Sequence, residues 1–345
     1  MKINIKTITT IGAFVALFYS AQADTSWTGS VNSSWENPSN WSGSYPSTSS
    51  GITYFHNGSA TAVSTQSFGD LRMSNSANQT TQITLESGAD FTNSLINMSA
   101  NGTENSKSYI NINNASWTTD TIYIANAPFA GAEAILKINY SGRLTARSIS
   151  IGTNELSNGL LSSDGGRITI TGGLTIGATG KVTLNSGAPL YFGNTSTAST
   201  ASINGTLNFG NGGNLYQVGS TNFRIGSTGN IVIQLSSSGS IFFDTLTLGD
   251  GITPAGTLTI ETGYRPISTL TEGTTIDLFD ANTIVGSFAE VYAPTLTEGL
   301  TWDFSQLYTT GSVSVIADII IPEPSTYALI FGALSLTLAI YRRRK

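Results

Sequence analysis

The sequence contains no cysteine and a single histidine among its 345 residues, and charged residues make up only 10% of it. Without cysteine, the chain can form no disulfide bridge, thiolate nucleophile, redox pair or cysteine-based zinc site. A single histidine excludes a multi-histidine metal site, and no motif in the sequence marks His56 as the base of a Ser-His-Asp triad. We therefore expect no metal ion and no cofactor, and a structural role for His56 beside Tyr54 and Phe55.

Basic residues are scarce before the C-terminal cluster, and the formal net charge is −6. A nucleic-acid-binding surface needs clustered lysine and arginine, so the chain is not expected to bind nucleic acid. Polysaccharide lyases with a solenoid fold gather acidic and basic side chains on one face. The body of this chain has few cations, and we expect them to be solvated on its outside: Lys137, Arg143, Arg147, Arg167 and Lys181.

Carboxylates are scattered, and calcium-binding repeats are absent apart from weak hints such as Gly249-Asp250-Gly251. A pair of carboxylates brought together by stacking could serve a glycosidase, and the sequence leaves that open. No residue can be assigned a catalytic role, so the sequence predicts a protein that is not an enzyme.

Polarity comes instead from serine, threonine and asparagine, together with 37 glycines. These residues disfavour helices, because their side chains compete for backbone hydrogen bonds or, for glycine, because helix formation costs more entropy. They suit strands and turns. The composition predicts an all-β protein.

Short segments that alternate apolar and polar residues recur through the middle of the chain, as in strands with one buried face. They include ITLES at 83–87, YININ at 109–113, RITIT at 167–171 and NIVIQL at 230–235. Many strand-like segments follow a small residue or threonine and then glycine, which can take a positive φ in a turn.

The spacing of these glycines gives the segments an order. Five of these turn glycines are Gly142, Gly166, Gly205, Gly229 and Gly256. Successive members are 24, 39, 24 and 27 residues apart, and Gly180 divides the interval of 39 residues into 14 and 25. A step near 24 matches one coil of a right-handed β-solenoid with two or three short strands. A β-sandwich or an irregular meander is the alternative, since both also give frequent turns.

Two flanking segments are predicted to close the repeat body at 61–274. Residues 24–60 carry Trp27, Trp35 and Trp41 among turn formers, and a bulky plug would cover the open end of a solenoid. The alternative is a carbohydrate-binding platform made by the three tryptophans. Residues 275–318 contain three strand-like runs that end in aromatic and aliphatic residues, so we expect a second cap there.

The N-terminal segment, 1–23, has the organisation of a secretory signal peptide. Lys2 and Lys6 precede an apolar run, and Ala21-Gln22-Ala23 has the form of an A-x-A cleavage site. The expected partners are the Sec machinery and signal peptidase, which would leave Asp24 as the first mature residue.

The C-terminal segment, 319–345, has a different character from the repeats. Pro322-Glu323-Pro324 precedes a mostly apolar run at 325–341, and Arg342, Arg343, Arg344 and Lys345 follow. A run of this length measures about 26 Å as a helix, so it is predicted to span a membrane with its cations on the cytoplasmic side. The prolines are expected to make the Pro322-Glu323-Pro324 stretch extended and exposed.

Two resemblances follow from these residues. The W-x-N-P-x-N-W string at 35–41 and the endings DLFDA and GLTWDFSQL resemble autotransporter-associated β-repeat passengers over about 24–318. The order of Pro-Glu-Pro, apolar helix and terminal arginines resembles the PEP-CTERM sorting signal. The second resemblance implies processing by an exosortase, a membrane cysteine transpeptidase-like enzyme, in a bacterium that makes exopolysaccharide.

Together these observations predict a secreted, surface-sorted, non-catalytic structural or adhesive protein of the bacterial envelope or exopolysaccharide matrix. It would be held at the inner membrane transiently and would then reach the cell surface or the matrix. The alternative is an extracellular carbohydrate-binding protein that uses its N-terminal tryptophans.

Overall fold

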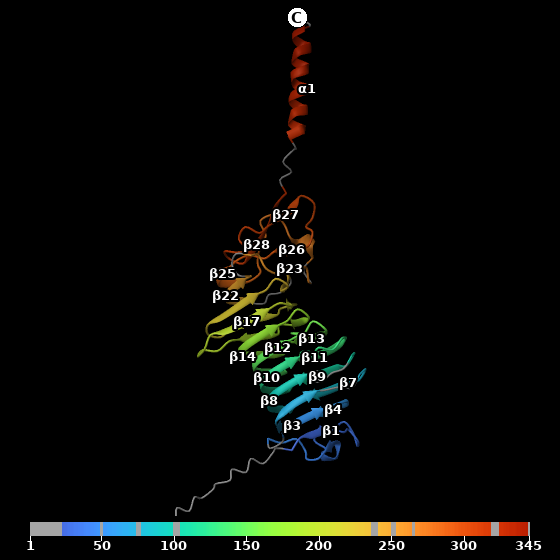
Figure 1. Cartoon of the computed structure of the whole chain (residues 1–345). Helices are drawn as coiled ribbons and strands as arrows, with labels where there is room; N and C mark the ends of the chain where they lie inside the picture. The colour runs from blue at the N-terminus through green and yellow to red at the C-terminus, as the bar shows by residue number, and fades with distance from the viewer. Residues whose placement is uncertain are drawn as a thin grey trace, which may run out of the picture.

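The computed structural model describes residues 23–48, 51–73, 77–98, 104–235, 241–249, 253–263, 266–318 and 324–343. Most of its strands belong to a β-solenoid of about nine turns, and the one α-helix within these ranges lies near the C-terminus (Figure 1). The predicted all-β solenoid is therefore confirmed.

Two long sheets form the walls of the solenoid. The first sheet has 15 strands: β1 (Thr25–Trp27), β2 (Trp41–Ser42), β3 (Ile52–Phe55), β5 (Thr65–Ser67), β6 (Asp70–Met73), β8 (Asp90–Met98), β10 (Ser116–Ile124), β12 (Arg143–Ile151), β14 (Arg167–Ile176), β16 (Pro189–Phe192), β17 (Ser199–Ile203), β19 (Asn214–Gln217), β20 (Thr221–Ile225), β22 (Phe242–Leu248) and β25 (Asp280–Val285). The second has ten: β4 (Gly58–Ala62), β7 (Thr80–Leu85), β9 (Lys107–Asn113), β11 (Ala132–Asn139), β13 (Ser157–Asp164), β15 (Gly180–Asn185), β18 (Thr206–Phe209), β21 (Asn230–Gln234), β23 (Thr257–Glu261) and β26 (Glu290–Tyr292).

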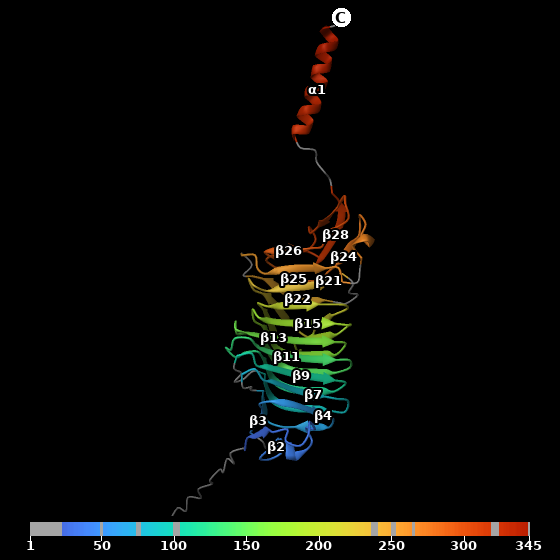
Figure 2. The ribbon, with the colours of Figure 1, turned by 90° about the vertical axis from the view of Figure 1, so that its right-hand side faces the viewer.

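The chain passes from one sheet to the other and back, so each coil stacks in parallel on the coil before it (Figure 2). In the first sheet, Ser116 lies opposite Asp90 of the preceding coil and opposite Arg143 of the following coil. A β-sandwich pairs its strands mainly antiparallel. The in-register parallel pairing excludes that alternative and the meander.

Alternation along each strand builds the core. In β8 and β10, every second side chain over most of the strand is buried, and the same position repeats in each coil. Stacking places like residues above one another between the sheets, as in the inward row Met73, Met98, Ile124, Ile151, Ile176, Ile203, Ile225 and Leu248.

The glycine spacing has a different physical basis from the one predicted. Gly142 and Gly166 precede strands of the first sheet, whereas Gly180, Gly205 and Gly229 begin or precede strands of the second. The interval of 39 residues from Gly166 to Gly205 is therefore not one coil: it connects a turn before the first sheet with a turn before the second sheet. Within the spacing series, only Gly256 has a positive φ. At Gly205 a Cβ would clash with the carbonyl oxygens of Gly177 and Gly180 in the equivalent turn of the preceding coil, so the close backbone approach requires glycine.

Some coils contain three strands, as the spacing allowed. The first half of β14 pairs with β16 and its second half with β17, and this split continues into β19 and β20. Gly193 lies directly after β16, and its positive φ lets the chain leave the sheet before β17. The split lengthens the coil without disturbing the stacking.

The N-terminal cap covers the first coil. β1 pairs antiparallel with β2 and parallel with β3, and Ser34 forms a bridge to Thr61 at the edge of the second sheet. A 3-10 turn at Pro38–Asn40 lies between them. Parallel coil pairing already begins at β3 and β4, so the solenoid starts near residue 52 rather than 61.

The C-terminal cap is a separate antiparallel sheet of β24 (Thr275–Asp277), β28 (Ser312–Ala317) and β27 (Leu300–Asp303). A 3-10 turn at Ile267–Thr269 comes shortly before it. Leu307 is buried, and Trp302 and Phe304 pack against the core. The predicted cap at 275–318 also includes β25 and β26, which belong to the last coil of the solenoid.

The tail contains the predicted helix as α1 (Pro324–Arg343), slightly longer than 325–341. Pro324 is helical rather than extended, in keeping with the preference of proline for the first helical turn. No helix in the described ranges is long and apolar enough to cross a membrane. The membrane span predicted at 325–341 is therefore not borne out in the described part of the helix.

Candidate functional site

A column of polar side chains follows the corner where strands of the second sheet end. Asn113 lies opposite Asn139, Asp164 opposite Asn185, and Gln234 opposite Glu261. In the β18 coil the equivalent position is Gly210, and the next residue, Asn211, carries the side chain. We call the set the corner column: Glu86, Asn113, Asn139, Asp164, Asn185, Asn211, Gln234 and Glu261.

The first part of the corner column satisfies its own hydrogen bonds. The Asn113 Nδ2 donates to Glu86 Oε1 at 3.0 Å, and the Asn139 Nδ2 donates to Asn113 Oδ1 at 2.8 Å. Each amide is thereby tied to the coil before it. These three residues form a continuous ladder that adds side-chain bonds to the backbone ladder.

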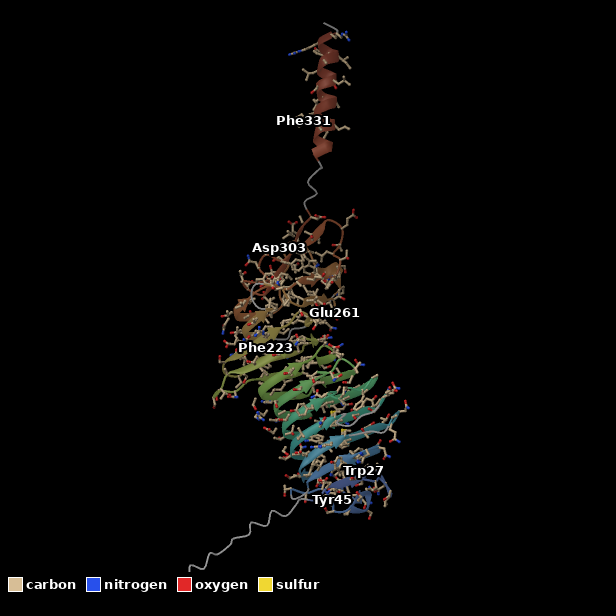
Figure 3. All side chains as sticks on the ribbon, in the orientation of Figure 1. Trp27, Tyr45, Phe223, Glu261, Asp303 and Phe331 are labelled. Atoms are coloured by element: carbon tan, nitrogen blue, oxygen red, sulfur yellow. The ribbon has the colours of Figure 1, made fainter. Side chains whose placement is uncertain are left out.

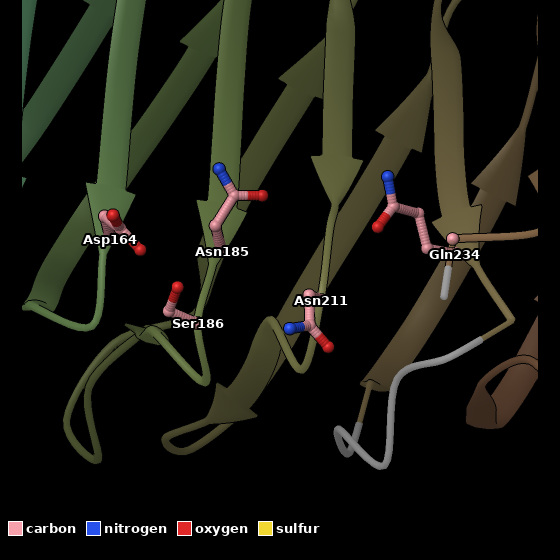
Figure 4. Close-up of a pocket in the computed structure, with 6 residues that line it drawn as sticks. Asp164, Asn185, Ser186, Asn211 and Gln234 are labelled. Atoms are coloured by element: carbon pink, nitrogen blue, oxygen red, sulfur yellow. The ribbon is translucent and has the colours of Figure 1, made fainter. Parts of the chain in front are cut away.

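The next part of the column borders an open groove instead. Its volume is about 450 Å³, and its lining comes from Asp164, Asn185, Ser186, Asn211, Gln234 and Gly263. Figure 4 shows the labelled side chains spread over successive strand ends. We call this feature the corner groove.

Polar atoms in the corner groove are left open. Among the residues that the structure describes, the side chains of Asp164, Asn185, Ser186 and Asn211 make no hydrogen bond to one another or to any other group. The Gln234 Nε2 donates to Glu261 Oε2 at 3.2 Å, which closes the far end. The groove therefore offers amides, a hydroxyl and one carboxylate to a ligand.

Backbone bonds hold the groove in shape. The Gly165 amide donates to the Asn185 carbonyl at 3.2 Å, and the Gly187 amide donates to the Asn211 carbonyl at 3.1 Å. Ser186 has a φ of 53°, so its side chain projects from a left-handed corner. Backbone hydrogen bonds between coils therefore hold the turns from which the exposed side chains of Asp164, Ser186 and Asn211 project.

No feature of the groove supports catalysis or metal binding on its own. The described residues include no group of three or more His, Cys, Asp or Glu that could hold a metal ion. Asp164 is the single carboxylate in the groove, while a glycosidase needs two. The described polar groups that line the groove are hydrogen-bond donors and acceptors.

The three predicted tryptophan contacts are inside the N-terminal cap. Trp27, Trp35 and Trp41 are only 4%, 0% and 5% exposed. Trp35 packs edge to face on Trp41, with ring centroids 4.7 Å apart, and lies 5.1 Å from Phe91 of the body. Their faces are unavailable to a sugar, so the platform alternative is not supported, although an edge of Trp27 borders a hollow of about 370 Å³.

Glu36 fastens this cap to the first coil. Its carboxylate accepts hydrogen bonds from the Val63 amide at 2.7 Å and from the Ser34 hydroxyl at 3.1 Å. Burial acts to raise the pKa of Glu36, but these bonds outweigh it and the pKa is lowered. Burial, with the Glu36 charge, raises the pKa of Tyr45 to about 12.

The predicted outward cations all lie at the surface: Lys137, Arg143, Arg147, Arg167 and Lys181. Arg147 forms a two-pronged ion pair with Asp120 at 2.5 and 2.8 Å, and Arg167 lies 4.0 Å over the Tyr191 ring. The Arg147 hydrogen bond and charge lower the pKa of Asp120. His56 stacks on Tyr54 at the surface, with centroids 5.4 Å apart.

Most of the predicted sorting and cleavage residues lie outside the described residues. These are Ala21, Pro322, Glu323, Arg344 and Lys345. Ala23 is described and exposed, and Arg342 and Arg343 are exposed in the last turn of α1. Side chains along the helix from Ala328 to Arg343 are all exposed, including Phe331, which Figure 3 labels.

Sequence reasoning did not find the corner groove. A signal was present, because an asparagine or aspartate shortly before glycine ends three second-sheet strands at Asn139, Asp164 and Asn185, and Asn211 follows the end of a fourth. Such pairs are common in any turn, so the residues alone do not tell which rungs bond to one another.

Comparison with known proteins gives no relative: no protein-family model, no curated protein and no solved structure matches this chain.

Proposed function

We propose that this protein is an exported, non-catalytic structural or adhesive component of the bacterial envelope or exopolysaccharide matrix, sorted through its C-terminal signal. The observation that carries the proposal is the contrast between a capped solenoid and an exposed apolar helix that follows it. A rod with a cap at each end suits a spacer or adhesive role, because the caps pack against the apolar core at the ends of the coil stack.

The outer surface of the body supports an extracellular role. Outward columns consist largely of serine, threonine and asparagine, such as Thr92, Thr118, Thr145 and Thr169 on successive coils of the first sheet. These hydroxyl and amide groups can hydrogen-bond to water, so the outer surface is polar although it has few charges and few ion pairs. The described residues contain two, Arg147 with Asp120 and Lys107 with Glu133.

The coils are taken to be right-handed. Strands β8 and β10 are parallel neighbours joined through β9 in the opposite sheet. Crossover connections between parallel strands are right-handed in almost all proteins, because strands themselves twist in that sense. This supports the hand expected from the repeat.

Processing at the tail is the second part of the proposal. The Sec machinery and signal peptidase would release the chain after Ala23, and an exosortase would act at or near Pro322-Glu323-Pro324. Support comes from the motif order and from the exposure of the described helix side chains, which leaves the helix free for such an enzyme. The mature body would end at the cell surface or in the matrix.

Cell fractionation of the source bacterium tests this proposal. A strain with Pro322, Glu323 and Pro324 all changed to alanine is compared with the wild type by immunoblot. We expect wild-type protein at the surface or in the matrix and retention of the variant in the cell fraction. Equal distribution of the two proteins would contradict sorting through this motif. A strain with Pro294→Ala, a proline of the folded body, controls for loss of any proline.

A further inference from the structure

We propose that the corner groove binds an uncharged, extended oligosaccharide of hexose units. The inference goes beyond the proposed function, because it assigns a binding site and a ligand class to the body, and it does not depend on processing of the tail.

The contrast within the corner column leads to this site. Asn113 donates to Glu86 and accepts from Asn139, so each of the three side chains has a hydrogen-bond partner within the column. Asp164, Asn185 and Asn211 continue the same column on the coils that follow Asn139 but make no such bonds within the described chain. The same kinds of side chain are stabilising in one stretch and available in the other.

The groove has a regular geometry. Neighbouring coils are about 4.8 Å apart, as in any sheet, so the rungs from Asp164 to Gln234 extend over roughly 14 Å along the solenoid axis. A ligand that fits them is extended and presents hydrogen-bonding groups at short, repeating intervals. A polymer of sugar rings with several hydroxyls on each ring has this pattern.

The chemistry of the lining selects among ligands. The carboxamides of Asn185 and Asn211 both donate and accept, and the Ser186 hydroxyl does the same. Hydroxyl groups of a sugar need such mixed partners. None of the described residues that line the groove is basic, so they offer no counter-charge to an anionic polymer, and Asp164 would repel it.

Isothermal titration of the full chain with cellohexaose, laminarihexaose and mannohexaose tests the proposal, with hexagalacturonate as the acidic comparison. We expect at least one neutral hexamer to bind and the acidic one not to bind. Asn185→Ala combined with Asn211→Ala removes two hydrogen-bonding side chains, so affinity should fall by about tenfold or more. Asn211→Ala alone, at an exposed position, should weaken binding by a smaller factor.

The matched control is Asn113→Ala, which changes the same residue type in the same column. It removes bonds to Glu86 and Asn139, so we expect a lower melting temperature with unchanged affinity, the reverse of Asn211→Ala. The proposal is overturned if no neutral hexamer binds at about 10 mM, or if Asn113→Ala weakens binding as much as Asn211→Ala. Titration with Ca²⁺ completes the test: calcium binding lost in Asp164→Asn, without sugar binding, would assign the groove to a cation instead.

Discussion

The solenoid and the C-terminal helix place their apolar side chains in opposite environments. In the solenoid, Ile122 and Ile149 stack between the two sheets and are at most 1% exposed. In the helix, Leu329 is 77% and Phe331 67% exposed. Burial of apolar area is the main stabilising term in folding, so the described part of the helix adds little to the stability of the body. Its apolar surface has to serve a purpose other than folding.

Polar groups show the same contrast. In the body, many threonines and asparagines lie on the outside, and some bond from coil to coil, as Thr257 does to Asn230. In the helix, the Ser335 and Thr337 hydroxyls turn back to the carbonyls of Phe331 and Ala333. Such internal bonds satisfy the hydroxyls without a partner from outside. Polar side chains thus bond between coils in the solenoid but within the helix in the tail.

The largest effect is expected from a pair of aromatic truncations. Trp35→Ala should lower the free energy of unfolding by about 3 to 5 kcal/mol, because it empties the centre of the N-terminal plug. Phe331→Ala in the helix should leave unfolding of the body unchanged. Chemical denaturation of both variants checks the pair. A similar loss in the two would show that the helix packs on the body.

Replacing one glycine in the solenoid and one in the helix tests how closely the backbone is packed in each region. A Cβ at Gly205 would meet the carbonyls of Gly177 and Gly180, so Gly205→Ala should cost about 1 to 3 kcal/mol of stability. Gly332 has nothing within 4 Å of the position of a Cβ, and Gly332→Ala should favour the helix slightly with no effect on the body. Thermal unfolding followed by circular dichroism separates the two. A stable Gly205→Ala variant would mean that the coils can move apart there.

The smallest effect concerns pH. The lowered pKa of Glu36 means that its bonds stabilise the fold above the ordinary glutamate value of 4.5, and that this stabilisation disappears as pH falls through the lowered pKa. Glu36→Gln should therefore cost about 1 kcal/mol near pH 7, kept small by partial exposure, and the difference should narrow in acid. Denaturation at several pH values measures it. A difference that grows as the pH falls would contradict the assigned role.

Much of the fold followed from the sequence, because alternation and turn spacing are local signals. The solenoid, its two caps and the helix at 325–341 could all be predicted in this way. The reason for glycine at Gly205 could not be, since it depends on carbonyls that other turns bring close. The boundary between the N-terminal cap and the solenoid, near residue 52, could not be predicted either, because it depends on the parallel pairing of β3 with β6.

The candidate site was less predictable. Trp27, Trp35 and Trp41 look alike as potential sugar contacts in the sequence, yet burial removes their faces from solvent. The groove at Asp164 and Asn185 depends on which neighbouring rungs leave side chains unbonded, and this is a property of stacking between residues far apart in the chain.

Intact mass of the mature protein from wild-type cells tests most directly whether the tail is a removable sorting signal rather than part of the fold. We predict a chain that begins at Asp24 and ends at or near Pro322-Glu323-Pro324, with the helix and the arginine cluster absent. A mass that extends through Lys345 would contradict it.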